Sequence, residues 1–100
     1  MAKHAEIRID NNAATIYGDL DFSNVMSIYQ QSQKLFTAPQ SEIIIDFIEL
    51  KSTNSAALAL IINWMRLAKK QKKNIQFRNL SNDIMSLAKS SGLDKVIAHA

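Results

Sequence analysis

Cysteine is absent from this chain, and glycine and proline are scarce, with two and one among its 100 residues. Without cysteine the chain has no disulfide framework, no thiolate metal ligand and no cysteine nucleophile. Two glycines are too few for a phosphate-cradling loop, and neither G-x-G-x-x-G nor G-x-x-x-x-G-K-[ST] occurs. No apolar run approaches the roughly 20 residues that cross a bilayer, and the first residues lack an apolar signal segment. We therefore expect a cytoplasmic protein that does not bind nucleotide by itself.

What the chain does contain is enough apolar material for one core. Hydrophobic residues make up 47% of the sequence and charged residues 21%, so residues 1–100 are expected to form a single globular domain. The net charge of +3 is unevenly spread. Residues 1–50 carry three basic and seven acidic side chains, and residues 51–100 carry nine and two, which gives −4 and +7 for the two halves.

Hydrophobic periodicity predicts an alternation of strands and helices. Period-two and β-branched patterns predict strands at 5–10, 14–20, 43–50 and 74–80, and the 43–50 strand is apolar enough to be covered on both faces. Helical spacing predicts a helix from Ser23 or Asn24 to Pro39, a long helix at 56–71, and a short helix from Ser81 to a left-handed end at Gly92. The order is β-β-α-β-α-β-α. It indicates an α/β domain with a small mixed sheet of about four strands and helices packed mainly on one face.

Few residues offer catalytic chemistry, and we predict that the protein is not an enzyme, with no metal and no cofactor. His4 and His99 lie at opposite ends of the chain. Asp46 lies within an apolar strand, where a carboxylate needs a partner or a strand end. A basic cluster near the end of the long helix is better explained by the helix dipole than by nucleic-acid binding. Its members are Arg66, Lys69, Lys70, Lys72, Lys73 and Arg78.

The long helix has an apolar arc that is too wide for one face of a sheet to cover. One stripe includes Leu58 and Met65, and a second includes Leu60, Trp64 and Leu67. Either a neighbouring helix covers the second stripe, which we favour, or that stripe faces a partner protein.

Ser55 stands where the long helix begins. Thr53, Asn54 and Ser55 are three successive side chains that can cap this helix, and Ser55 is expected to serve as an ordinary N-cap, whose hydroxyl accepts a hydrogen bond from a first-turn amide. The alternative is phosphorylation, which would place about −1.5 to −2 charges at an exposed helix end.

Residues 46–58, Asp-Phe-Ile-Glu-Leu-Lys-Ser-Thr-Asn-Ser-Ala-Ala-Leu, resemble the STAS-domain signature D-L-S-x-V-x-x-[IV]-D-[ST]-[SA]-G-[LI] without a gap. Features of the long helix resemble the MlaB branch of that family. The resemblance implies a STAS-like fold over the whole chain and a subunit without catalytic activity. Its partner would be the ATPase of an ABC-type phospholipid transporter that maintains lipid asymmetry in Gram-negative bacteria. Such a subunit would lie in the cytoplasm or, through its partner, at the inner membrane.

The resemblance also implies an alternative, an anti-sigma-factor antagonist whose Ser55 is phosphorylated by a partner kinase. Asn54 stands where the signature has Asp, and Ala57 where it has Gly, and both differences weigh against a phosphorylation switch. The positive charge at the end of the long helix is expected near the docking face, which favours an acidic partner. The residues expected to contact the partner are Thr53, Asn54, Ser55, Ala56, Leu60, Asn63, Trp64 and Leu67.

Overall fold

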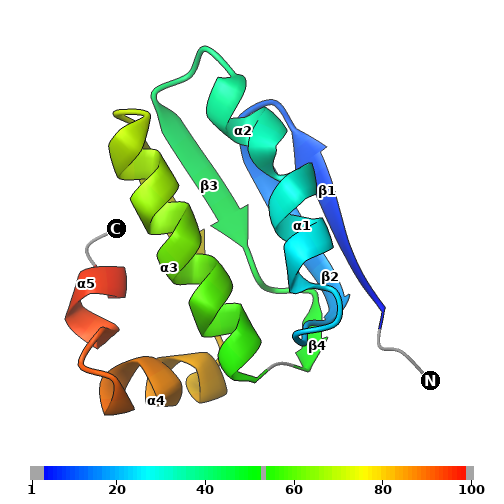
Figure 1. Ribbon diagram of the computed structural model, residues 1–100, viewed down its shortest axis with the longest axis vertical. Helices are drawn as coiled ribbons and strands as arrows, with labels where there is room; N and C mark the ends of the chain where they lie inside the picture. The colour runs from blue at the N-terminus through cyan, green and yellow to red at the C-terminus, as the bar shows by residue number, and fades with distance from the viewer. Residues whose placement is uncertain (1–3, 53, 99–100) are drawn as a thin grey trace.

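The structure is a computed structural model, and it describes residues 4–52 and 54–98. Those residues form five strands and five helices around one hydrophobic core (Figure 1). The strands are β1 (Ala5–Asp10), β2 (Ala13–Asp19), β3 (Glu42–Asp46), β4 (Leu50–Ser52) and β5 (Asn74–Arg78). The helices are α1 (Val25–Gln31), α2 (Gln33–Thr37), α3 (Ser55–Lys70), α4 (Asn82–Ser90) and α5 (Asp94–Ala98).

The sheet is mixed, as predicted. Its strand order is β1-β2-β3-β5, and β4 pairs with β2 beyond the end of β3. β1 and β2 form an antiparallel hairpin, whereas the pairs β2–β3, β2–β4 and β3–β5 are parallel. The predicted α/β architecture is confirmed, with the short strand β4 added to the four expected.

Helices cover one face of the sheet, with α1, α2 and α3 in front of it and α4 and α5 beside α3 (Figure 1). In β3 the side chains of Ile43 and Ile45 are fully buried under these helices, whereas Ile44, on the other face, is half-buried. The expectation that this strand is covered on both faces is therefore wrong. The uncovered face carries charged side chains such as Arg8, and a hydrogen bond and the charge of Glu6 raise the pKa of its guanidinium.

The strand predicted over 43–50 ends early, at Asp46. One oxygen of the Asp46 carboxylate accepts hydrogen bonds from the Ile48 amide (2.9 Å) and the Asn79 side chain (2.8 Å). This pairing explains the acid at the end of an apolar strand, because the carboxylate closes a turn and ties β3 to the residue that follows β5. The chain then enters β4. Gly18, with φ of +90°, lies at the irregularity where β2 changes its partner to β4.

The single helix predicted before Pro39 is instead two helices, α1 and α2, which meet at Ser32. Ser32 is fully buried, and its hydroxyl donates to the Tyr29 carbonyl oxygen (2.6 Å) and accepts from the Trp64 indole N–H (2.8 Å). A buried hydroxyl must be hydrogen-bonded to be tolerated, and this one joins the helix junction to the centre of α3.

Candidate docking surface at the start of helix α3

The carboxyl ends of the parallel strands meet at one end of the molecule, the lower end in Figure 1. Phe22 follows β2, Ile48 follows β3, and Asn54 follows β4 and precedes α3. Phe22 is 64% exposed and Ile48 is 60% exposed, so two large apolar side chains face solvent at the end where α3 begins. Exposed apolar side chains gathered at one place are typical of interaction surfaces.

The N-cap of α3 is Asn54, and the prediction that Ser55 caps this helix is wrong. The Asn54 side-chain oxygen accepts a hydrogen bond from the Ala56 amide (2.8 Å). Ser55 is the first helical residue and is exposed, and within residues 4–52 and 54–98 its hydroxyl has no hydrogen-bond partner. The hydroxyl is therefore available to a partner protein or to a modifying enzyme.

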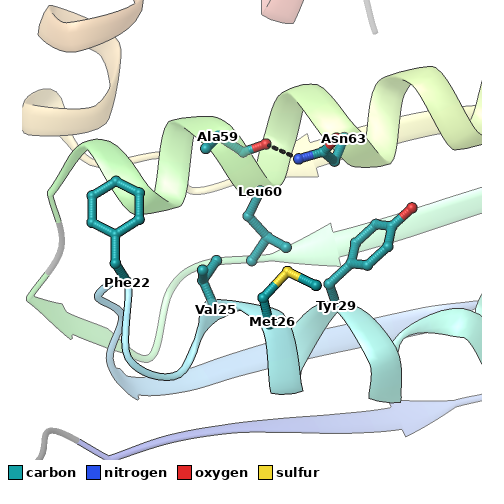
Figure 2. A pocket seen from close by; sticks show the side chains of 7 residues that line it. All are labelled: Phe22, Val25, Met26, Tyr29, Ala59, Leu60 and Asn63. Atoms are coloured by element: carbon teal, nitrogen blue, oxygen red, sulfur yellow. Dashed lines mark hydrogen bonds between the residues drawn. The ribbon is translucent and has the colours of Figure 1, made fainter.

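The loop that presents Phe22 is held by its neighbours. Asn24, in the N-cap position of α1, forms no side-chain cap there. Its side chain accepts from the Asp21 amide (3.1 Å) and donates to the Asp19 carbonyl oxygen (2.8 Å). The Asp21 carboxylate accepts from the Ser23 amide (2.8 Å). These bonds close the turn around Phe22, whose ring is 64% exposed and extends toward the first turns of α3 in the view of Figure 2.

Some predicted contact residues are exposed and others belong to the core. Asn54, Ser55 and Asn63 are exposed, and Leu67 is half-buried against the core. Thr53 lies outside the described residues. Three predicted contacts belong to the core, with exposed fractions of 0–2%: Ala56, Leu60 and Trp64.

Trp64 lies at the centre of an aromatic cluster. Its ring centroid is 6.3 Å from that of Phe47 and 6.3 Å from that of Phe77. The second apolar stripe of α3 is thus covered from within, by the adjacent helices and the aromatic side chains of the sheet. The favoured prediction, that a neighbouring helix covers this stripe, is confirmed, and the expectation that Trp64 anchors a partner is wrong.

A groove between α1 and α3 escaped the sequence analysis. It has a volume of about 360 Å³, and Phe22, Val25, Met26 and Tyr29 line one side (Figure 2). Ala59, Leu60 and Asn63 line the other, and the Asn63 amide group donates to the Ala59 carbonyl oxygen (3.0 Å). Met26 is 63% exposed. The signal in the sequence that could have revealed this groove is Met26, an apolar residue that lies off the helical stripe of Val25, Ile28 and Tyr29.

Apart from Arg78, which ends β5, the basic cluster lies toward the opposite end of α3 from Ser55. Helix α3 has 16 residues, and a rise of 1.5 Å per residue places Lys70 roughly 22 Å from Ser55. The Lys73 ammonium donates to the carbonyl oxygens of Ala38 (2.6 Å) and Gln40 (2.7 Å), so this lysine holds the connection between α2 and β3. The expectation that positive charge lies near the docking face is therefore wrong for the part of that face around Ser55.

The Ser55 end of the molecule carries carboxylates instead. Four acidic residues follow the carboxyl ends of β2 and β3 or end those strands, and the strands that end here also contribute Lys51 and Arg78. The acidic residues are Asp19, Asp21, Asp46 and Glu49. The two ends of the domain thus differ in the sign of their charge.

Residues 4–52 and 54–98 contain no group of three or more histidine, aspartate or glutamate side chains placed to hold a metal ion. Across the same residues, no helix combines the length and the apolar composition that crossing a bilayer requires.

A small mixed sheet with helices on one face, and an exposed serine opening the helix that follows the central strands, defines a STAS-type domain. The family model described as "Mlab, STAS domain" matches residues 6–98, and the chain belongs to this family. The resemblance seen in residues 46–58 is thereby confirmed. A search of curated protein sequences found no match.

The fold is also similar to a solved structure, that of the anti-sigma factor antagonist SpoIIAA in its unphosphorylated form. The match has a TM-score of 0.68 and 22% sequence identity, and it covers 94% of this chain and 84% of the other. At this identity the similarity establishes the shared fold.

Proposed function

We propose that this protein is a non-catalytic accessory subunit that binds the ATPase of an ABC-type phospholipid transporter. The observation that carries the proposal is the exposed Ser55, which opens α3 without capping it, at the end of the molecule that also exposes the apolar side chains of Phe22 and Ile48. Membership of the MlaB-type family supports the ATPase as the partner. The subunit would act in the cytoplasm and reach the inner membrane only through the transporter.

Asn54 and Ser55 have different roles at the start of α3, and this difference supports a binding role for Ser55. Asn54 supplies the hydrogen bond that α3 needs at its start, so the Ser55 side chain contributes little to helix stability. A hydroxyl exposed at the start of a helix can donate or accept one hydrogen bond inside a desolvated interface, where an unpaired partner group is costly.

Binding of the purified protein to the transporter ATPase tests this role. We expect Ser55→Arg, which places a bulky charged side chain at the centre of the surface, to weaken ATPase binding at least tenfold in a calorimetric or surface-plasmon titration. Ser86→Arg, at an exposed position on α4, is the matched control and should bind as the wild type does. Equal affinity of the Ser55→Arg and Ser86→Arg proteins would refute the proposal.

A second candidate function is that of an anti-sigma-factor antagonist regulated by phosphorylation of Ser55. The fold shared with SpoIIAA and the free Ser55 hydroxyl favour it. The carboxylates at the same end disfavour it, because they would repel the added charge of a phosphate. Mass spectrometry of the protein isolated from its own cells distinguishes the two candidate functions. A phosphopeptide that contains Ser55, and whose formation releases the partner, supports the antagonist. Binding of the unmodified protein to the ATPase supports the transporter subunit.

A further inference from the structure

The groove between α1 and α3 begins at the Ser55 end, with which it shares Phe22, and continues along α3. The two helices run side by side in the same direction, and both begin at the Ser55 end (Figure 1). Phe22 and Met26 stand on one rim, and Ala59 and Asn63 form the opposite wall (Figure 2). With exposed fractions of 64% and 63%, the two rim side chains place a large apolar area in water. Such a rim beside an apolar hollow is typical of a binding site for another protein.

The two segments that form the groove lack charge. Residues 22–33 and residues 54–65 contain no charged side chain, although 21% of the whole sequence is charged. The centres of protein interfaces are depleted of charged residues and enriched in methionine and aromatic residues, which is the composition found here.

Charged residues lie at both ends of the groove, and their signs are opposite. Arg66 and Lys70 are exposed and follow Asn63 at spacings of three and seven residues, so they continue the groove side of α3 toward its C-terminus. At the other end Asp21 directly precedes Phe22, and Glu49 is exposed in the connection between β3 and β4. The groove is therefore apolar in the middle, basic at one end and acidic at the other.

We propose that this groove binds an amphipathic helix of a partner protein, and that the helix lies antiparallel to α3. Helices commonly carry acidic residues in the first turn and basic residues in the last turn, because these charges complement the helix dipole. In the antiparallel orientation the acidic first turn meets Arg66 and Lys70, and the basic last turn meets Asp21 and Glu49. Apolar side chains spaced i, i+3 or i+4, and i+7 enter the hollow beside Met26. Only the identity of the partner, the transporter ATPase, rests on the proposed function.

Site-specific photo-cross-linking in the source cells tests the occupant. A p-benzoylphenylalanine in place of Met26 or Asn63 probes the groove, and one in place of Ile48 probes the Ser55 end. We expect positions 26 and 63 to cross-link to one helical segment with acidic residues at its start and basic residues at its end. The proposal would be overturned by any of three results: no adduct from these positions, an adduct that joins two copies of this chain, or a cross-linked segment with another order of charges.

The same experiment separates this proposal from the proposed function. Adducts to the ATPase from position 48 but from neither groove position would leave the proposed function standing and overturn the groove proposal. Adducts from positions 26 and 63 to a helix of the stated charge order in a different protein would support the groove and overturn the transporter assignment.

A charge exchange tests the orientation of the helix. We expect Arg66→Glu to weaken binding of the cross-linked partner about tenfold, and reversal of an acidic residue in the first turn of the partner helix to restore it. The matched control is Lys89→Glu, an exposed charge reversal on α4 that should leave affinity unchanged. If a charge reversal in the last turn of the partner helix restored binding instead, the antiparallel orientation would be wrong.

Discussion

Ser32 shows how one buried hydroxyl can determine the geometry around it. It stands between α1 and α2 and accepts the hydrogen bond of the Trp64 indole N–H. Among the described residues no buried side-chain nitrogen or oxygen atom lacks a partner, so removing this hydroxyl would create an unsatisfied donor in the centre of the core. This contact joins the junction of α1 and α2 to the centre of α3.

We expect Ser32→Ala to lower the free energy of unfolding by about 1–3 kcal/mol, the cost of leaving a buried donor unpaired. Urea unfolding followed by the fluorescence of Trp64, the sole tryptophan in the sequence, measures the change. Ser27→Ala, at an exposed position of α1, is the control and should change stability by no more than about 0.5 kcal/mol. If both variants unfold at the same urea concentration, the hydrogen bond does not stabilise the fold.

At the scale of elements, α3 and α4 end in the same way but with different residues. The Lys72 amide donates to the Lys69 carbonyl oxygen (3.2 Å) and the Lys73 amide to that of Ala68 (2.8 Å), which is a Schellman motif. In α4 the same pattern places Gly92 in the left-handed position with φ of +72°, as the sequence predicted. In α3 that position is taken by Lys72, with φ of +57°.

Lys72→Gly is expected to raise the free energy of unfolding by about 0.5–1 kcal/mol. Glycine relieves the left-handed strain of a residue with a Cβ, although its unfolded state is more flexible. Lys72→Ala removes the same charge and keeps the strain, so the difference between the two variants isolates the backbone effect. Thermal unfolding monitored by circular dichroism provides the measurement, and a glycine variant no more stable than the alanine variant would contradict this reasoning.

The whole molecule separates its charges along the direction of α3. The Ser55 end carries most of the carboxylates of the first half of the chain, and the end with Lys69 and Lys70 carries much of the positive charge of the second half. A partner that spans the domain therefore needs both signs of charge in a defined order. A polyanion would meet attraction at one end and repulsion at the other.

Because of this arrangement we expect no specific binding of nucleic acid, in spite of the net charge of +3. Lys73 is already engaged with two carbonyl groups, and the cationic surface is short. Fluorescence anisotropy with a labelled DNA duplex at low ionic strength should give a Kd weaker than about 10⁻⁴ M. Tighter binding that falls steeply with added salt would show that the basic end is a nucleic-acid surface.

Several features of this protein follow from local sequence patterns. The hairpin at Asn11-Asn12, the long helix α3 and the left-handed end of α4 at Gly92 depend on residues close together in the chain. The family also follows from a contiguous stretch, residues 46–58. Periodicity and turn chemistry act over a few residues, which is why these features can be predicted.

Other features depend on contacts between distant segments. Ser32 meets Trp64, and Lys73 meets Ala38, and neither pairing can be predicted from spacing along the chain. Only the fold showed that Trp64 is core, that Asn54 rather than Ser55 caps α3, and that Phe22 and Met26 stand beside the groove. Sequence by itself determined the family and the order of the longer elements, although not β4 or the break between α1 and α2, because local patterns specify the longer elements. The tertiary structure decided which side chains reach solvent together, because exposure depends on what the rest of the chain covers.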